Sequence, residues 1–177
     1  MVSEAKGYAR YVVESSPYNL LDRRVENERV PLCQRCGLGM VTWSPIAMGM
    51  LAGRYPLDEA FPEGSRAAAD PKGIYAQRIN RRGLQVASKV PEIADGFGLT
   101  AGQASLLWVK DQPGITAPII GPRSVEQLEE MLEVADMKAN DELRAAFDEL
   151  NGPGMAVSNF HNTSGWMKAT VEGDGIT

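Results

Sequence analysis

Three short apolar runs along the chain have the composition of buried β-strands. They are YARYVV (residues 8–13), GMVTW (residues 39–43) and ITAPII (residues 115–120), and they carry β-branched and aromatic residues. A helical segment at residues 25–36 lies between the first two runs, as the crossover helix of a βαβ unit does. The pattern therefore predicts strands that lie parallel to one another and are joined by helices.

Further helical segments separate the second and third predicted strands. Within residues 77–97 apolar positions recur at helical spacing and give one buried stripe. Pro91 interrupts this stripe, and because a proline inside a helix costs about 3 kcal/mol, we expect a break close to Lys89. The next helix opens at TAGQ, where Thr100 and Gln103 form a capping box. The order of elements predicts an α/β fold with a parallel sheet.

The remaining stretches are predicted to be a loop and a tail. Residues 55–73 are rich in proline, glycine and alanine and form a loop long enough to be functional. From residue 152 to residue 177 the periodicity is lost, and we expect an irregular tail with a frayed end at EGDGIT. The sequence thus predicts one folded unit over residues 1–151, followed by a tail over residues 152–177.

Composition and charge narrow the classes of function. The chain has 177 residues, 44% of them apolar, and so fits one ordinary globular domain. Its 18 lysines and arginines against 23 acidic residues argue against a nucleic-acid-binding or membrane-surface protein. No apolar run approaches the roughly 18 residues of a membrane span, and the N-terminus lacks a signal pattern. We therefore expect a cytoplasmic protein whose partners are small molecules or other proteins.

The two cysteines, Cys33 and Cys36, form a CQRC motif, which in some α/β proteins is a redox pair. Here both thiols fall in the last turns of a helix that Gly37 ends, and the helix dipole disfavours a thiolate at that position. A structural role is the favoured interpretation. Only His161 could join the cysteines at a zinc ion, whereas a structural zinc site takes four ligands, so no metal is predicted.

Two segments that follow predicted strands carry candidate ligand chemistry. Residues 43–55 (WSPIAMGMLAGRY) contain glycines that would let the backbone approach a ligand. Residues 119–131 (IIGPRSVEQLEEM) open a helix with a second capping box, Ser124 and Gln127, beside Arg123. An arginine at a helix N-terminus suits a phosphate, and parallel α/β barrels bind phosphates after their last strands. Each segment alone is a weak signal, because glycine-rich loops often only pack and arginines are often solvated.

Four ordered motifs carry a family resemblance. They are SPYNLLDRR (residues 16–24), the stretch at residues 43–55, PEGSR (residues 62–66) and PIIGPRSVEQLEEM (residues 118–131). Over residues 4–151 the chain resembles the C-terminal half of an aldo/keto reductase. The resemblance implies part of a (β/α)8 barrel, with about three parallel strands and flanking helices. It also implies a cofactor, NADP(H), that exchanges hydride with a carbonyl in the complete enzyme.

The resemblance also implies a set of cofactor-binding residues. Trp43 would stack on the nicotinamide ring, and Arg54 would lie near the phosphates. The loop folded over the pyrophosphate would comprise Ser44, Pro45, Ile46, Gly49, Leu51 and Gly53. The adenosine and the 2′-phosphate, which distinguishes NADP from NAD, would contact Gly121, Arg123, Ser124, Gln127 and Glu130. Three positions depart from the family pattern and remove expected polar contacts: Ser15, Ala52 and Met131.

The catalytic residues of the family are not assigned in this chain. The family's tetrad of Asp, Tyr, Lys and His lies on earlier strands. In the family the tyrosine donates a proton to the carbonyl and the lysine lowers the pKa of that tyrosine, so without them the carbonyl is not activated. His161 is not expected to be catalytic. The favoured function is therefore the cofactor-binding half of an NADP(H)-dependent aldo/keto reductase. The alternatives are a non-catalytic nucleotide-binding or protein-interaction module, as in potassium-channel beta subunits, and an inactive truncated relic.

Three strands cannot close a barrel, so an apolar sheet face and open edges are expected. A separate N-terminal half or a homo-oligomer would cover them. VSNF at residues 157–160 resembles the family's fifth strand, which a circular permutation would place here, but it is interpreted as tail. The candidates for a substrate pocket are Phe61, Trp166 and Met167, although loop aromatics often only pack locally.

Overall fold

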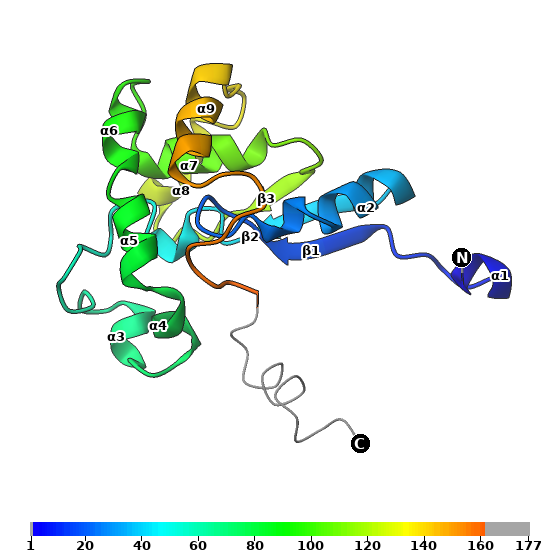
Figure 1. Cartoon of the computed structure of the whole chain (residues 1–177), viewed down its shortest axis with the longest axis horizontal. Helices are drawn as coiled ribbons and strands as arrows, with labels where there is room; N and C mark the ends of the chain where they lie inside the picture. The colour runs from blue at the N-terminus through cyan, green and yellow to red at the C-terminus, as the bar shows by residue number, and fades with distance from the viewer. Residues whose placement is uncertain (1, 162–177) are drawn as a thin grey trace.

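A sheet of three parallel strands forms the centre of the structure (Figure 1). The computed structural model describes residues 2–161. The strands, in their order across the sheet, are β1 (Val13–Pro17), β2 (Gly39–Trp43) and β3 (Ala117–Ile119). Ser15 is the partner of Val41 across the first pair, and Trp43 is the partner of Ile119 across the second. The predicted α/β unit with about three parallel strands is confirmed.

The first strand does not lie where the apolar pattern placed it. We expected residues 8–13, but β1 begins only at Val13, and the residues before it lead out to the short helix α1 (Val2–Lys6), away from the sheet (Figure 1). Tyr11 is 87% exposed. The reason is that β2 begins at Gly39, whose amide donates to the Val12 carbonyl at 2.8 Å, and the residues before Val12 lie beyond this end of the strand pair. The partnered segment is instead the more polar VESSP.

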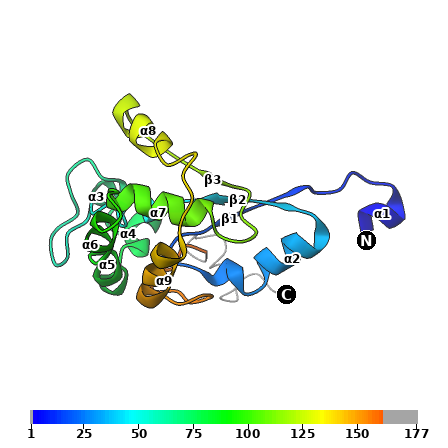
Figure 2. The same cartoon turned by 90° about the horizontal axis from the view of Figure 1, so that it is seen from above.

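Helices flank the sheet, and several of them lie in the long connections that follow its strands. They are α2 (Arg29–Cys36), α3 (Arg66–Ala69), α4 (Ile74–Arg78), α5 (Arg81–Ala87), α6 (Val90–Asp95), α7 (Ala101–Lys110), α8 (Val125–Leu132) and α9 (Asp141–Leu150), with 3-10 turns η1 (Arg24–Glu26) and η2 (Ala47–Gly49). Helix α2 packs against β2 and α7 against β3. Figure 2 shows α2 and α9 on one side of the sheet and α8 on the other.

Capping residues and prolines in the sequence predicted several helix boundaries correctly. The break expected near Lys89 separates α5 from α6, and Pro91 stands in the first turn of α6. The Thr100–Gln103 capping box is formed in both directions at the start of α7. A second break was not predicted: Asn80 caps α5 through its side chain and so ends α4 before it. The helix expected over residues 25–36 is likewise divided into η1 and α2.

The cysteine motif is part of a helix end, as predicted. Helix α2 ends at Cys36, and Gly37 follows in the left-handed conformation that terminates helices. Cys33 is buried, and burial raises the pKa of its thiol, whereas Cys36 is exposed. Both cysteines are free. Among residues 2–161 no group of three or more His, Cys, Asp or Glu side chains is arranged to hold a metal ion.

The core is built on an aromatic cluster around Trp108 of α7. Tyr18 lies 5.5 Å and Phe147 lies 5.9 Å from the indole, measured between ring centroids. The guanidinium carbon of Arg23 lies 4.9 Å from the same indole centroid. All four side chains are almost completely buried, and Arg23 is only 2% exposed. A charge at this depth requires partners, because removing it from water costs several kcal/mol.

Arg23 has those partners. It donates to Glu26 at 2.7 Å, to Asp148 at 2.6 Å and to the backbone carbonyl of Asn151 at 2.7 Å. Burial alone would lower the pKa of Arg23, but the bonds to the two carboxylates outweigh it and raise the pKa. Burial together with the Glu26 carboxylate also raises the pKa of Tyr18, which donates to Glu26. This network joins the loop after β1 to the end of α9.

The described residues after α9, 152–161, form no helix or strand, and they are docked on the body of the protein. The backbone amides of Val157 and Ser158 donate to the carbonyl of Leu21, and the amide of Phe160 donates to Asp22 at 2.8 Å. Phe160 is 1% exposed. Residues 157–160 lie outside the three-stranded sheet, and their assignment to the tail stays a prediction. The frayed end expected at EGDGIT, together with Trp166 and Met167, lies outside the described residues.

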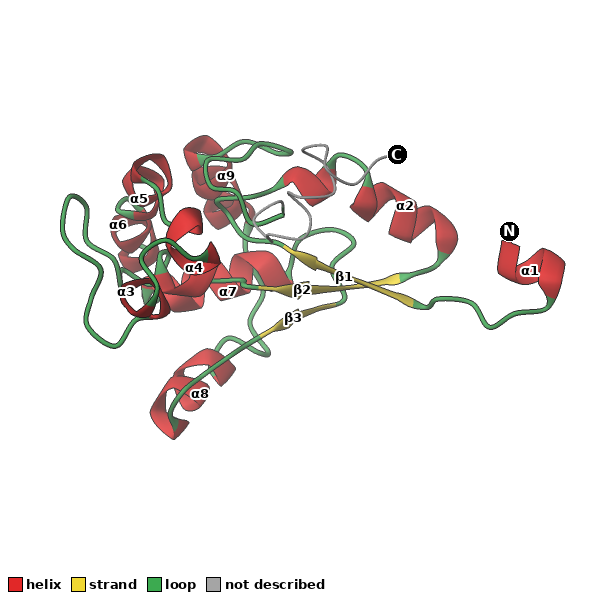
Figure 3. Cartoon of the chain, turned by 90° about the horizontal axis from the view of Figure 1, so that it is seen from below, coloured by secondary structure: helices red, strands yellow, loops and turns green. Residues whose placement is uncertain are grey.

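One face of the sheet is left uncovered, as expected for three strands of a barrel (Figure 3). The strand registers place Val13, Val41, Trp43 and Ile119 on this face, since side chains alternate along each strand. Val13 is 49% and Ile119 is 48% exposed.

Of residues 2–161, no helix is long and apolar enough to cross a membrane. The cytoplasmic location stays a prediction.

Asp22 anchors the docked tail to the loop after β1 and gives the fold an acid-sensitive bond. It is fully buried and accepts two bonds from Arg24 in addition to the amide of Phe160, and Nδ1 of His161 lies 3.1 Å from its carboxylate. Burial alone would raise the pKa of Asp22. The bonds from Arg24, His161 and Phe160 outweigh burial and lower the pKa from 3.8 to about 2.

A folded-state pKa below the unfolded value stabilises the protein above about pH 4, and the effect is lost as pH falls toward 2. We predict that Asp22→Asn lowers the free energy of unfolding at pH 7 by about 2 kcal/mol and flattens the loss of stability between pH 4 and pH 2. Urea unfolding across that range measures both effects. The control is Asp136→Asn at an exposed position. Equal acid profiles for Asp22→Asn and the unaltered protein would contradict the assignment.

Candidate ligand site

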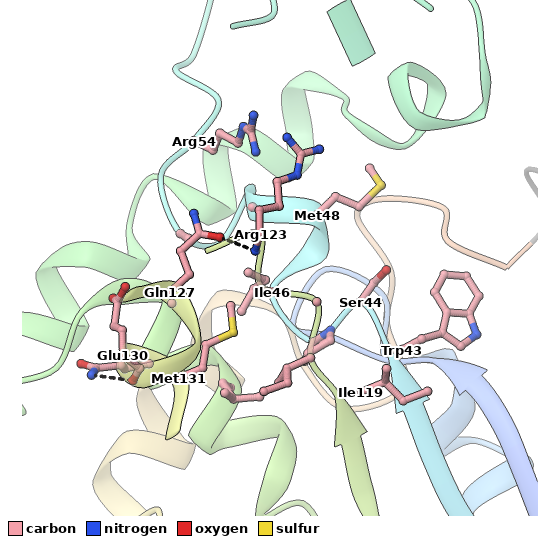
Figure 4. A pocket seen from close by; sticks show the side chains of 18 of the residues that line it. Trp43, Ser44, Ile46, Met48, Arg54, Ile119, Arg123, Gln127, Glu130 and Met131 are labelled. Carbon is pink, nitrogen blue, oxygen red and sulfur yellow. Dashed lines mark hydrogen bonds between the residues drawn. The ribbon is translucent and has the colours of Figure 1, made fainter. Parts of the chain in front are cut away.

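A pocket of about 750 Å³ opens at the carboxyl ends of β2 and β3 (Figure 4). Loops that follow both strands meet there, together with α7 and α8. Most of the predicted site residues line it, namely Trp43, Ser44, Pro45, Ile46, Gly49, Arg54, Gly121, Arg123, Gln127 and Glu130. The structure therefore brings together two segments that are separated by more than sixty residues in the sequence.

Three predicted residues support the pocket from outside its lining. Leu51 is completely buried in the hydrophobic core. Gly53 takes a left-handed backbone conformation, with φ of 73°, in the turn that follows η2. Ser124 caps α8 by accepting a hydrogen bond from the amide of Gln127 at 3.3 Å. These three residues shape the loop and the helix, and they lie outside the pocket lining.

The loop after β2 has an unusual backbone. Ser44, Ala47 and Met48 have φ values of 59°, 49° and 61°, although side chains disfavour this left-handed region. Asn19 helps to hold this conformation, since its side-chain amide donates to the Ser44 carbonyl at 3.1 Å. Asn19 belongs to the SPYNLLDRR motif, so one role of that motif is to fix the pocket loop. Strain of this kind accumulates at sites that hold ligands.

Gly49 allows Arg54 to lie across the same loop. Its φ of 97° is in the region that favours glycine, and its carbonyl accepts from the Arg54 amide at 3.0 Å. A Cβ at Gly49 would lie 3.2 Å from both Cβ and Cδ of the Arg54 side chain. Gly49 was predicted to let a ligand approach the backbone. Its lack of a side chain also leaves room for the side chain of Arg54.

The second segment is held by the start of α8. The capping box predicted there is formed in one direction only, because the side-chain oxygen of Gln127 accepts from the Arg123 amide at 2.8 Å and the amide of Ser124 is not its partner (Figure 4). The prediction of a reciprocal box is thus wrong by one residue. The Arg123 side chain donates to the Gly64 carbonyl at 3.4 Å, which ties α8 to the loop over residues 55–73.

Glu130 is fixed by the neighbouring helix. Its carboxylate accepts from the Thr100 hydroxyl at 2.8 Å, and its backbone carbonyl accepts from the side-chain amide of Gln103 at 3.1 Å. The capping box of α7 therefore also positions a wall of the pocket. Figure 4 shows Glu130 and Gln127 at one side of the pocket and Trp43 at the other.

The charge of the lining is positive. Arg54, Arg66 and Arg123 line the pocket, and Glu130 is the one carboxylate that the described lining contains. Figure 4 shows Arg54 and Arg123 on the same side. Arginine presents a planar set of donors that matches phosphate oxygens, and the eight-residue helix α8 directs its N-terminus toward the same region. This arrangement can bind a phosphorylated ligand with an apolar portion.

Several lining residues were missed. These are Met48, Tyr55, Arg66, Tyr75, Gly102, Gln103, Leu106, Ile119 and Ile120, and the departures Ala52 and Met131 join them. The PEGSR motif contained a signal for Arg66, whose guanidinium lies 5.1 Å from the Tyr75 ring centroid. Phe61 is absent from the lining among the described residues, and it packs edge-on against Tyr55 at 6.4 Å.

This geometry defines a parallel α/β unit with an arginine-lined ligand pocket at the carboxyl ends of its strands. The model of the Aldo/keto reductase family matches residues 1–152. The chain belongs to the aldo/keto reductase family.

Named relatives agree with this assignment. The chain is 35% identical over 153 residues to the "Uncharacterized oxidoreductase YrpG" of Bacillus subtilis, covering 86% of this chain and 44% of that protein. It is 31% identical over 140 residues to "Aldo-keto reductase yakc [NADP(+)]" of Schizosaccharomyces pombe, with coverage of 77% and 41%. A "Probable voltage-gated potassium channel subunit beta" of Arabidopsis thaliana is 33% identical over 128 residues, with coverage of 71% and 39%. The chain thus spans less than half the length of these relatives.

The contact between Gly49 and Arg54 predicts the effect of one added methyl group. Gly49→Ala should lower the free energy of unfolding by about 1–3 kcal/mol, because the backbone is left-handed and the Arg54 side chain must move. Urea unfolding at pH 7 measures this.

The matched control for this change is Gly121→Ala. A Cβ at Gly121 meets nothing within 4 Å, and its φ lies outside the left-handed range, so stability should change by less than about 0.5 kcal/mol. If both variants unfold at the same denaturant concentration, the structural role of Gly49 is wrong.

Proposed function

We propose that this pocket binds NADP(H) and forms the cofactor side of an aldo/keto reductase. The observation that carries the proposal is the convergence of three arginines, the start of α8 and the Trp43 ring on one pocket of about 750 Å³. Membership of the family and the name of the Schizosaccharomyces pombe relative support the same cofactor.

The residues present fit such a ligand. Trp43 would lie against the flat nicotinamide ring, and the left-handed loop after β2 would face the pyrophosphate. Arg123 and Gln127 would hold the 2′-phosphate, with Arg54 and Arg66 near the other phosphates. Ala52, Leu106 and Met131 give the adenine an apolar wall. When bound, NADPH supplies the hydride that reduces a carbonyl, while these side chains bind and orient the cofactor.

Proton transfer is not assigned to a residue of this chain. The family's Asp, Tyr, Lys and His tetrad is proposed to lie on strands outside the matched segment, and residues 1–152 are proposed to bind the cofactor without supplying the proton for carbonyl reduction. A non-catalytic nucleotide-binding or protein-interaction module is the second candidate. Two observations favour it: an open sheet face and a relative named as a potassium channel subunit. An inactive relic is the third.

Arg123→Met tests the site directly. The variant should bind NADPH roughly tenfold to a hundredfold more weakly, since one charge-assisted hydrogen bond contributes about 1.5–3 kcal/mol, and NADH, which lacks the 2′-phosphate, should lose less than threefold. The measurement is quenching of tryptophan fluorescence in parallel titrations with NADPH and NADH. Arg82→Met, at an exposed position on α5, is the matched charge control.

These titrations separate a nucleotide-binding chain from an inactive relic and test the assignment of the 2′-phosphate. Saturable binding that favours NADPH, without reduction of carbonyl substrates, supports a cofactor-binding half or a binding module. Equal losses for both nucleotides in Arg123→Met would remove the 2′-phosphate assignment. A folded chain that binds neither nucleotide would support the relic.

We also propose that a second copy covers the open sheet face when the chain is alone. Val13→Lys places a charge on that face, whereas Leu32→Lys places one on the exposed side of α2. Sedimentation velocity should show a concentration-dependent association that Val13→Lys weakens at least tenfold and Leu32→Lys leaves unchanged. A monomer at all concentrations would contradict the proposal, and a separately encoded N-terminal half would then be the occupant to seek.

A further inference from the structure

Arg78 is a buried cation at the end of α4, just behind the Trp43 end of the pocket. Its guanidinium carbon lies 5.2 Å from the ring centroid of Trp43, 5.5 Å from that of Phe160 and 5.9 Å from that of Tyr75. Its Nη1 also lies 3.9 Å from the sulfur of Met48. Trp43, Tyr75 and Met48 all line the pocket, whereas Arg78 itself does not.

These contacts are favourable for a buried guanidinium. A cation over an aromatic face contributes about 0.5–2 kcal/mol, with the larger values in desolvated positions. Arg78 is buried, and burial lowers the pKa of its guanidinium, although the group remains charged near neutral pH. The planar group therefore restricts the rings around it, and the Trp43 indole is one of them.

The docked tail supplies one of those rings. Phe160 is fixed from the other side by the hydrogen bond that its backbone amide donates to the Asp22 carboxylate, and by the contacts of Ser158. Asn80, two residues after Arg78, donates to the Ser158 hydroxyl at 3.0 Å, and a Cβ on Gly83 would lie 2.1 Å from that oxygen. The tail thus packs tightly on the junction of α4 and α5. Contacts run without a gap from Asp22 through Phe160 and Arg78 to Trp43.

We propose that Arg78 is a positioning residue that, with Phe160, fixes the orientation of the Trp43 indole and so couples docking of residues 155–161 to nucleotide affinity. The effect on affinity rests on the proposed NADP(H) site. The orientation of the Trp43 indole does not depend on that proposed site, because Arg78 and Phe160 act on the ring in the chain without nucleotide. Neither Arg78 nor Phe160 needs to touch the ligand for this coupling.

Fluorine NMR of protein labelled with 5-fluorotryptophan tests the positioning directly. The chain has three tryptophans, and Trp43→Phe assigns the resonance of interest. Arg78→Met, which keeps side-chain length but removes the cation, and Phe160→Leu should both shift or broaden the Trp43 resonance and leave that of Trp108 in place. Arg78→Lys should restore the resonance in part, and Arg82→Met should leave it unchanged.

Titration with NADPH supplies the second measurement. Arg78→Met and Phe160→Leu should weaken binding roughly threefold to tenfold, and Arg78→Lys should lie closer to the unaltered protein. A Trp43 resonance that stays in place in both Arg78→Met and Phe160→Leu overturns the proposal. So does a moved resonance with unchanged affinity. If the unaltered chain does not bind NADPH, the proposed function fails, and the resonances alone decide the positioning role. Should Arg78→Met unfold, Phe160→Leu and Arg78→Lys give the decision.

Discussion

The buried guanidinium of Arg23 is the interaction on which the rest of this structure depends. It contacts the Trp108 ring at the centre of the core and donates to groups on η1 and α9. A buried ion pair adds little net stability compared with a well-packed apolar group, but an arginine left without its partners is strongly destabilising. Glu26 and Asp148 are therefore required to stay where they are. That requirement fixes how the loop after β1 meets α9 and the segment that follows it.

The pocket is fixed by the same loop. Asn19, Asp22 and Arg23 are neighbours in the SPYNLLDRR motif, and each holds a different part of the protein: the Ser44 carbonyl, the docked tail and the end of α9. A strained backbone after β2 persists only where surrounding contacts determine it. The motif supplies one of those contacts. The motif overlaps the end of the first strand and lies outside the pocket lining, so the sequence alone does not indicate this role.

What the sequence predicted correctly depends on neighbours within a few residues. Gly37 ends α2, Pro91 starts α6, and Thr100 caps α7, because caps and breaks are set by local backbone chemistry. Ten of the thirteen predicted site residues line the pocket, and they were found through motifs, which preserve such local patterns. The start of β1 and the burial of Phe160 were not predictable in this way. Both depend on partners far along the chain, Gly39 in the first case and Asp22 in the second.

The open face and the pocket share residues, which limits how that face can be covered. Trp43 and Ile119 belong to the uncovered face by strand register, and both also line the pocket. The other pocket walls come from α3, α4, α7, α8 and the loops of this same chain. A segment that covers the face would therefore border the pocket along Trp43 and Ile119, while the arginines on the far side keep their contacts. The proposed recognition of phosphate and the covering of the sheet face are thus separable, and they meet at the Trp43 indole, which contacts Arg78.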